Sequence, residues 1–223
     1  MQENIDTLGI VFTGGEGPKE QALKTVFSGL AAGTIIVAAD SGLILAEKAG
    51  LKPDWIIGDM DSIKSEDCLE GYPKEKIIRY PKEKDHTDTE LALSLLLEKG
   101  CGSIWIAGGG GGRIDHLFGI RDLFERESFP KRWLIADEDI YCIDAVLNDR
   151  FFPAVNRGAL VSVFPLGGGP WKAESRGLKW NLEGVNWKRG YYGLSNIAID
   201  KLVEINALQG RFMIIFSETL CQR

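Results

Sequence analysis

The chain has 223 residues, 44% of them hydrophobic and 26% charged, so it can bury the core of one large domain or two small ones in a water-soluble protein. Its formal net charge of −6 argues against nucleic acid or an anionic membrane as a partner, but is compatible with a cationic small molecule or a metal-chelated anion. No apolar run approaches the roughly 20 residues of a membrane-spanning helix, and the first residues lack a secretory signal pattern, so we expect a cytoplasmic protein.

The four cysteines are widely scattered and form no C-x-x-C pair. Such spacing is typical of reduced thiols and unlike a disulfide framework or a zinc site. We therefore expect Cys68, Cys101, Cys142 and Cys221 to be free.

The first part of the chain alternates short apolar runs with helical patterns. Apolar runs without internal alternation, each followed by a helix, are typical of a parallel sheet that is covered on both faces. We therefore expect residues 1–137 to form an open, mostly parallel α/β sheet (Rossmann-like). The expected strands are 8–12, 34–40, 54–61, 76–80, 103–109 and 132–137, and the expected helices are 21–33, 41–50, 88–100 and 115–127.

From residue 138 the pattern changes to short β-rich segments that are divided by glycine, asparagine and proline. No helix-length pattern remains there, so we expect residues 138–223 to form a smaller antiparallel β-sandwich domain. The expected strands are 139–148, 159–166, 177–182, 192–199, 201–206 and 211–218.

The stretch KDHTDTE (84–90) is unusually acidic for a helix start. Thr87 and Glu90 fit a capping box, in which the side chain of each accepts a hydrogen bond from the backbone of the other. Asp88 in the first turn also interacts favourably with the helix dipole. Neither effect explains Asp85 or His86, which precede the cap, so this stretch is also a candidate ligand site.

A second acidic cluster follows the expected strand 54–61, where Asp59 and Asp61 flank Met60. If the chain is still extended, the two carboxylates lie on the same side and repel each other unless a cation lies between them. Oxygen ligands of this kind suit Mg²⁺, which takes one or two carboxylates together with substrate phosphates. The alternative is an ordinary turn, where aspartate is common. We favour the ligand site, because ligands of open α/β sheets bind beyond the carboxyl ends of the strands.

A third cluster is the glycine run that precedes the helix at 115. Glycine lets backbone N–H groups approach a phosphate, and a helix N-terminus adds partial positive charge. The run matches neither common phosphate-loop motif, and a flexible turn is the alternative. Arg113 offers a planar fork for phosphate oxygens. The candidate residues are Gly109, Gly110, Gly111, Gly112, Arg113, Asp115 and His116.

The stretch AADSG ends a strand in Asp40 just before a helix. Ser41 is either a helix cap or a ligand residue, and Asp40 could bind a ribose hydroxyl or the substrate. Four strand ends therefore present acids or an arginine to one rim of the sheet, and this pattern indicates Mg-nucleotide chemistry.

The stretches AADSG, PDWIIGDMDS, DHTD and GGGGGRIDH, in this order and spacing, resemble the thiamine pyrophosphokinase family. The resemblance covers most of the chain, because GLKWNL and GLSN resemble the β domain of that family. It implies an enzyme that converts thiamine and ATP to thiamine diphosphate and AMP with Mg²⁺. It also implies a homodimer whose active sites lie at the subunit interface, each built from the α/β domain of one chain and the β domain of the other.

The resemblance also assigns roles to residues of this chain. Asp59, Asp61, Asp85 and Asp88 match the metal and phosphate-handling acids of the family, and Arg113, Asp115 and His116 match its glycine-loop motif. Ser195 and Asn196 match the segment that holds thiamine, with a tryptophan nearby. Beside these assignments, the residues themselves make Asp40, Ser41 and the glycine run candidates for the nucleotide, and Trp171 and Trp180 candidates for thiamine. The permanently cationic thiazolium ring of thiamine suits an acidic protein and aromatic faces.

The expected mechanism is in-line attack of the thiamine hydroxyl on the β-phosphorus of ATP. Asp61, Asp85 and Asp115 are the candidates for the group that accepts the hydroxyl proton. One rival interpretation is a phosphatase of the haloacid-dehalogenase type, with Asp59 as nucleophile; another is a non-enzymatic nucleotide or thiamine sensor. Thiamine-dependent AMP, free phosphate, or neither product would separate the three.

Overall fold

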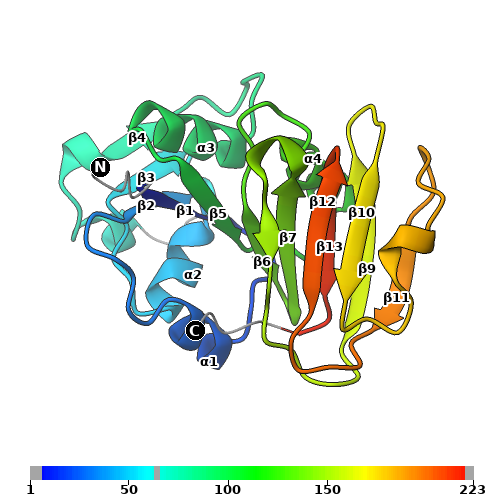
Figure 1. The fold of residues 1–223 in the computed structure, drawn as a ribbon. Helices are drawn as coiled ribbons and strands as arrows, with labels where there is room; N and C mark the ends of the chain where they lie inside the picture. Colours follow the sequence, from blue (N-terminus) through cyan, green and yellow to red (C-terminus); the bar gives the residue numbers. More distant parts are fainter. Residues whose placement is uncertain (1–6, 63–65, 219–223) are drawn as a thin grey trace, which may run out of the picture. The chain divides into compact units, whose positions relative to one another are not determined.

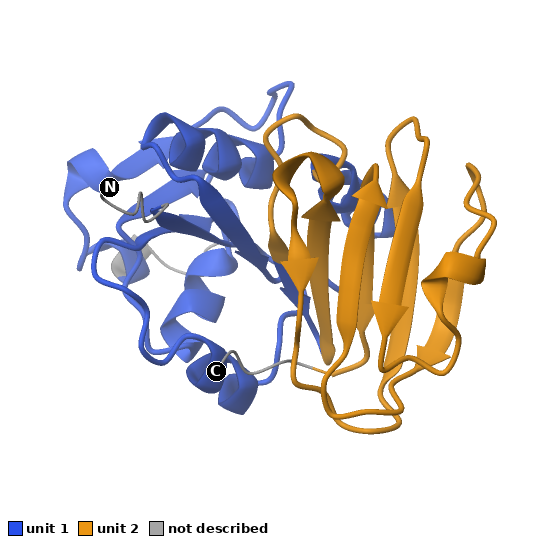
Figure 2. Cartoon of the chain, viewed as in Figure 1, with its two compact units in different colours: residues 1–123, 133–136 blue, residues 124–132, 137–223 orange. Residues whose placement is uncertain are grey.

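The computed structural model describes residues 7–62 and 66–218. Cys221 lies outside these ranges; the other three cysteines are free thiols, as expected. The chain divides into two compact units, residues 1–123 with 133–136 and residues 124–132 with 137–223 (Figure 2). In the described ranges no helix combines the length and apolar character that crossing a membrane requires.

The first unit is an open α/β sheet with strand order β6-β5-β1-β2-β3-β4 (Figure 1). β1 pairs in parallel with both β2 and β5, and β3 pairs in parallel with β2 and β4, as the apolar runs predicted. The strands are β1 (Leu8–Phe12), β2 (Ile35–Ala39), β3 (Trp55–Gly58), β4 (Ile77–Arg79), β5 (Ser103–Ala107) and β6 (Arg132–Ile135). The helices are α1 (Glu20–Val26), α2 (Gly42–Lys48), α3 (Asp88–Glu98) and α4 (Ile114–Leu123), with short 3-10 helices η1 (Glu66–Leu69) and η2 (Lys74–Lys76).

Helices cover both faces of this sheet. Ile10 and Phe12 of β1 pack with Leu23 of α1 and Ala46 of α2. The intervening Gly9 faces the other way, and a Cβ built on it would lie 2.9 Å from the side chain of Leu96 in α3. Because alternate residues of a strand point to opposite faces, α3 lies across the sheet from α1 and α2 (Figure 1).

All four helices are shorter than the sequence predicted. α1 ends at Val26, and the segment expected to continue it contains Gly29 and Gly33, both with positive φ. α4 ends at Leu123, four residues before the predicted end. Glycine tolerates positive φ without steric cost, so it ends helices readily.

The second unit is an antiparallel β-sandwich. One sheet has the order β11-β9-β13-β7 and the other β10-β12-β8. Residues from both sheets, among them Tyr141, Val163, Ile205 and Phe212, form one buried core. The strands are β7 (Glu138–Asp144), β8 (Arg150–Phe151), β9 (Leu160–Leu166), β10 (Lys172–Arg176), β11 (Gly193–Ile197), β12 (Glu204–Gln209) and β13 (Arg211–Phe216), with 3-10 helices η3 (Ala145–Leu147) and η4 (Leu182–Gly184).

The strand predicted at 177–182 is wrong. Leu178 makes only an isolated bridge with Ala198, and η4 begins at Leu182. The strand on this part of the chain is instead β10, with the polar sequence KAESR, in which only Ala173 and Ser175 are buried. A two-residue buried stripe gives too little apolar alternation for recognition from sequence.

Candidate active site

Three carboxylates meet at the carboxyl ends of β2 and β3. Asp40 follows β2, and Asp59 and Asp61 follow β3. One oxygen of each carboxylate lies within 4.8 Å of the others, which is a spacing suited to a shared metal ion. Asp40 and Asp59 are half-buried, whereas Asp61 is exposed. We call these residues, together with Asp88, the carboxylate cluster.

The backbone brings Asp59 and Asp61 together by a turn. The prediction of an extended chain here is wrong, because β3 ends at Gly58 and Met60 has a φ of 66°. The N–H of Asp61 donates to Asp59 Oδ1 at 3.1 Å, which closes the turn. Asp40 also has a positive φ, 49°. Left-handed backbone at non-glycine residues is costly and concentrates at functional sites.

Asp88, the first residue of α3, completes the cluster. A Cβ built on Gly58 would lie 3.3 Å from Asp40 Cβ and from Asp88 Cγ, so both acids close around this glycine. Burial raises the pKa of Asp88, and the charges of Asp59 and Asp40 raise it further, whereas Lys84 acts in the opposite direction. Asp40 Oδ1 and Asp88 Oδ1 are buried and accept no hydrogen bond from any residue that the structure describes. Buried carboxylate oxygens of this kind need a partner.

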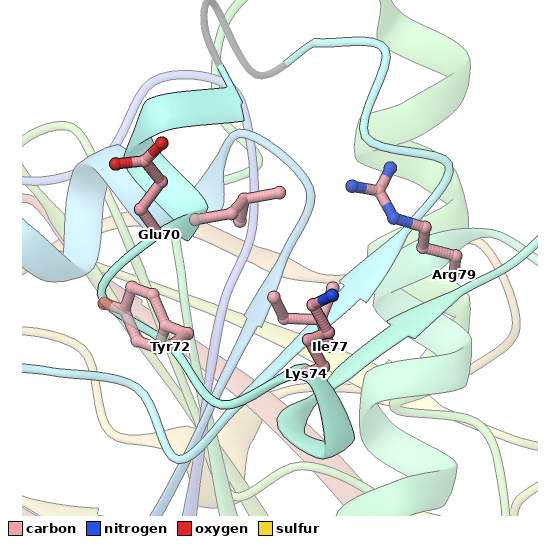
Figure 3. Close-up of a pocket in the computed structure, with 6 residues that line it drawn as sticks. Glu70, Tyr72, Lys74, Ile77 and Arg79 are labelled. Atoms are coloured by element: carbon pink, nitrogen blue, oxygen red, sulfur yellow. The ribbon is translucent and has the colours of Figure 1, made fainter.

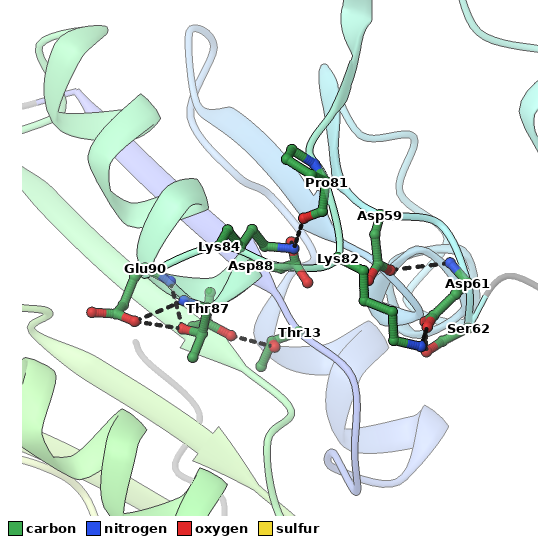
Figure 4. A network of polar contacts seen from close by, with 11 residues as sticks. Thr13, Asp59, Asp61, Ser62, Pro81, Lys82, Lys84, Thr87, Asp88 and Glu90 are labelled. Carbon is green, nitrogen blue, oxygen red and sulfur yellow. Dashed lines mark hydrogen bonds and ion pairs between the residues drawn. The ribbon is translucent and has the colours of Figure 1, made fainter.

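The start of α3 has the predicted capping box. Thr87 Oγ1 accepts a hydrogen bond from the N–H of Glu90 at 3.2 Å, and the carboxylate of Glu90 accepts one from the N–H of Thr87 at 2.8 Å. The hydroxyls of Thr89 and of Thr13, which directly follows β1, share a buried hydrogen bond of 2.7 Å (Figure 4). This bond fixes the start of α3, and therefore Asp88, against the centre of the sheet.

Asp85 and His86, which the capping box left unexplained, are both exposed. Asp85 does not belong to the group of acids with metal-ligand spacing that the described residues form, and Asp40 takes its place there. His86 Nδ1 lies 3.8 Å from Glu90 Oε1. The expectation that Asp85 binds metal is therefore unsupported by the geometry.

Two lysines that sequence reasoning missed approach the carboxylate cluster from the segment between β4 and α3 (Figure 4). Lys82 Nζ donates to Asp61 Oδ2 at 2.6 Å, and this hydrogen bond lowers the pKa of Asp61. Lys84 Nζ lies 3.1 Å from Asp88 Oδ1, as an ion pair without hydrogen-bond geometry. The available signal was the presence of two lysines in PKEKD, directly before the acidic stretch that begins α3.

The glycine run is tied to the segment after β1. The N–H of Gly109 donates to Gly14 O at 2.8 Å, and Gly110 and Glu16 exchange backbone hydrogen bonds of 2.9 and 2.6 Å. These amides are already occupied, which corrects the expectation that they bind phosphate. Gly111 and Gly112 have φ values of 65° and 62°, and their N–H groups make no hydrogen bond within the described residues.

The polar residues after the glycine run pair locally. Arg113 donates to both carboxylate oxygens of Asp115, at 3.1 and 2.5 Å, and this contact lowers the pKa of Asp115. His116 is exposed, and its backbone N–H donates to Asp115 Oδ1. Ser41 occupies the N-cap position of α2 but makes no capping hydrogen bond, so the capping interpretation of this residue is wrong.

In the second unit, Asn196 holds the backbone of Trp180. The buried Asn196 side chain accepts from the N–H of Trp180 at 3.1 Å and donates to its carbonyl at 2.6 Å. The Trp180 side chain is 54% exposed, and Lys179 Nζ lies 4.6 Å from its ring centroid. Ser195 is exposed and has a φ of 53°. Asn196 therefore holds the backbone that carries an accessible indole. Ser195, which precedes Asn196 in the chain, has a strained left-handed backbone.

Trp171 is engaged in the fold of the sandwich. Its indole Nε1–H donates to Leu166 O at 2.6 Å, and its ring lies against the backbone of Gly169 and Gly210. Of the two candidate tryptophans, Trp180 is thus the more accessible to a ligand.

A pocket of about 500 Å³ lies on the β3–β4 connection (Figure 3). No predicted site residue lines it in the part of the chain that the structure describes. Its lining residues are Leu69, Glu70, Tyr72, Lys74, Ile77 and Arg79.

Comparisons with known proteins agree on one family. Residues 29–131 match the family model described as thiamin pyrophosphokinase, catalytic domain. Thiamine pyrophosphokinase 1 of Oryza sativa subsp. japonica is 30% identical over 169 residues, which cover 70% of this chain and 63% of the relative. Thiamine pyrophosphokinase of Bacillus subtilis (strain 168) is 37% identical over 87 residues, 39% of this chain and 41% of that protein. The chain therefore spans less than two thirds of the length of these curated relatives.

Solved structures share the fold. The crystal structure of thiamine pyrophosphokinase from Bacillus subtilis matches with a TM-score of 0.74 and 24% identity, over 94% of this chain and 97% of that chain. The one from Geobacillus thermodenitrificans matches with a TM-score of 0.72 and 24% identity, over 97% and 100%. The family model, the curated relatives and the shared fold thus all indicate the thiamin pyrophosphokinase family.

Proposed function

We propose that the protein transfers the pyrophosphoryl group of ATP to the hydroxyl of thiamine, giving thiamine diphosphate and AMP. Similarity to this family supports this activity, and the observation that carries it is the convergence of Asp40, Asp59, Asp61 and Asp88 at the carboxyl ends of the strands. Pyrophosphoryl transfer needs positioning and charge neutralisation and no covalent intermediate. A carboxylate cluster that handles a metal-chelated anion fits that need.

The carboxylate cluster fits Mg²⁺. Its ligands are hard oxygens, and within the described part of the chain the buried Oδ1 atoms of Asp40 and Asp88 accept no hydrogen bond. Asp61 is exposed, and an exposed aspartate is ionised at neutral pH, so this carboxylate can also serve as a ligand. Asp40, Asp59, Asp61 and Asp88 would hold Mg²⁺, and the bound ion would supply positive charge that offsets the negative charge of the phosphates during transfer.

Two of the three candidates for the general base are paired with cations. Asp61 and Asp115 each pair with a cation that lowers the carboxylate pKa, which makes them poorer proton acceptors. Asp85 is exposed and stands three residues before the cluster member Asp88. We assign the base role to Asp85 and a phosphate-binding role to Arg113, with Gly111 and Gly112 as amide donors.

Thiamine is assigned to the second unit of the fold. Trp180 offers an exposed ring for the cationic thiazolium. Asn196 is hydrogen-bonded to the Trp180 backbone, and Ser195 precedes Asn196 in the chain. As in the implied family arrangement, we propose a cytoplasmic homodimer, with each active site shared between the α/β domain of one chain and the β-sandwich of its partner.

The direct test is incubation of the purified protein with ATP, Mg²⁺ and thiamine, with chromatographic detection of nucleotides. We expect AMP and thiamine diphosphate in equal amounts, and no AMP when thiamine or Mg²⁺ is omitted. Asp59→Asn is the matched inactive variant. Release of inorganic phosphate without AMP would refute the proposal and favour a phosphatase.

A further inference from the structure

Lys84 is a partly buried cation in the carboxylate cluster. Its side chain is only 13% exposed, compared with 78% for Lys82. Its Nζ lies 3.1 Å from Asp88 Oδ1 and donates to Pro81 O at 3.3 Å (Figure 4). Lysine is rarely withdrawn from water unless its charge is paired. The fold therefore places a positive charge at the acid that completes the cluster.

The surrounding charges explain this placement. Asp40 and Asp59 act on Asp88 as like charges and raise its pKa, whereas Lys84 lowers it. Like charges a few ångströms apart are unfavourable unless a cation offsets them. Lys84 thus relieves the repulsion at Asp88, while Lys82 does the same for the more exposed Asp61.

The contact is nevertheless incomplete. Among residues 7–62 and 66–218, none forms a hydrogen bond with Asp88 Oδ1, in spite of the nearby ammonium, or with the buried Asp40 Oδ1. A divalent cation carries twice the charge of the ammonium and can coordinate several carboxylates at once. An ammonium is a compact charge on a flexible stem, with three donors of free orientation. Lys84 is therefore suited to leave Asp88 for another anion.

We propose that the Lys84 ammonium pairs with Asp88 in the metal-free protein. When a divalent metal ion binds the carboxylate cluster, the ion replaces Lys84 at Asp88, and Lys84 then binds a phosphate of the nucleotide. No bond is made or broken, because one cation replaces another at a carboxylate. The contact between Lys84 and a nucleotide phosphate rests on the proposed function, whereas the exchange of cations at Asp88 does not.

The exchange is tested with Mn²⁺ alone, by electron paramagnetic resonance titration of nucleotide-free protein. Lys84→Met removes the competing charge, so we expect Mn²⁺ to bind about tenfold more tightly. Lys84→Arg keeps the charge and should bind Mn²⁺ as the wild type does. Lys82→Met is the matched control, because its exposed pair is screened by solvent and should change the affinity by less than about twofold. Unchanged or weaker Mn²⁺ binding by Lys84→Met would overturn the exchange.

The phosphate contact is tested with α,β-methylene ATP at saturating Mg²⁺. Lys84→Met should bind this analogue about tenfold more weakly, although it binds the metal more tightly. A lysine with a purely structural role would not give these opposite signs. Unchanged affinity for the analogue would refute the phosphate contact.

Wild-type protein provides a second measurement that does not depend on the folding of a variant. Brief acetylation followed by mass spectrometry reports the exposure of each lysine. We expect Lys84 to react slowly without metal, faster with Mg²⁺, and slowly again once α,β-methylene ATP is added. A rate that is independent of Mg²⁺ contradicts the exchange. Absence of thiamine-dependent AMP would refute the proposed function but leave the Mn²⁺ result standing.

Discussion

The buried ion pair between Arg132 and Asp139 gives the sharpest stability prediction. Their side chains are 1% and 0% exposed, and Arg132 donates to both Asp139 oxygens at 2.9 and 2.6 Å. Tyr141 Oη donates to the same carboxylate at 3.3 Å. Asp139→Asn keeps the shape but removes the negative charge of one partner of this buried pair. Removal of one partner of such a pair costs about 3–5 kcal/mol.

The assay is thermal and urea denaturation followed by circular dichroism, with tryptophan fluorescence as a second probe. For a chain of this size each 1 kcal/mol lowers Tm by about 2–4 °C, so we expect a loss of about 6–20 °C. The double variant Arg132→Met with Asp139→Leu removes both charges and should be markedly more stable than Asp139→Asn. If Asp139→Asn melts within about 2 °C of the wild type, the pair is not desolvated and the reasoning fails.

Three further predictions concern the active site. Asp85→Asn should lower the rate of AMP formation by about 10²–10⁴-fold with little change in Tm. Glu90→Gln should mainly lower Tm, by loss of about 1 kcal/mol of capping energy. The reverse pattern would mean that Glu90 is the catalytic residue and that Asp85 stabilises the fold. Burial raises the pKa of Asp88, so the ionised carboxylate opposes folding above that raised pKa, and this cost disappears as the pH falls through it. Asp88→Asn should therefore raise Tm in EDTA at neutral pH and abolish stabilisation by Mg²⁺. A lower Tm would show that the pair with Lys84 outweighs burial. Finally, a mixture of inactive Asp59→Asn and Trp180→Ala chains should regain about a quarter of the wild-type activity if each site is shared between two subunits, and no recovery would place each site within one chain.

Much of the first unit could be predicted because its signals are local. β1 has the bounds that the apolar run LGIVF predicted, and the carboxyl ends of parallel strands gather acids wherever the chain leaves the sheet. The capping box at Thr87 and Glu90 follows from four consecutive residues. In each case the information lies within one strand or one helical turn.

The remaining features depend on contacts between distant segments. The turn at Met60 and the use of the Gly109 and Gly110 amides by residues 14–16 follow from tertiary packing, which a glycine run or an Asp-x-Asp pattern cannot specify. Lys84 was overlooked for a similar reason, because burial of its side chain is a property of the folded cluster. Trp180 was placed in a strand because GLKWNL is apolar at intervals, although its backbone is instead held by Asn196.

The hydroxyl pair of Thr13 and Thr89 has a consequence for how variants of this protein should be interpreted. It joins the middle strand of the first sheet to the helix that carries Asp88, although neither hydroxyl belongs to the carboxylate cluster. Loss of either hydroxyl would free the helix to slide by a fraction of an ångström, and coordination to a divalent ion is sensitive to displacements of that size. Substitutions at such remote threonines can therefore imitate the loss of a ligand while every carboxylate is still present.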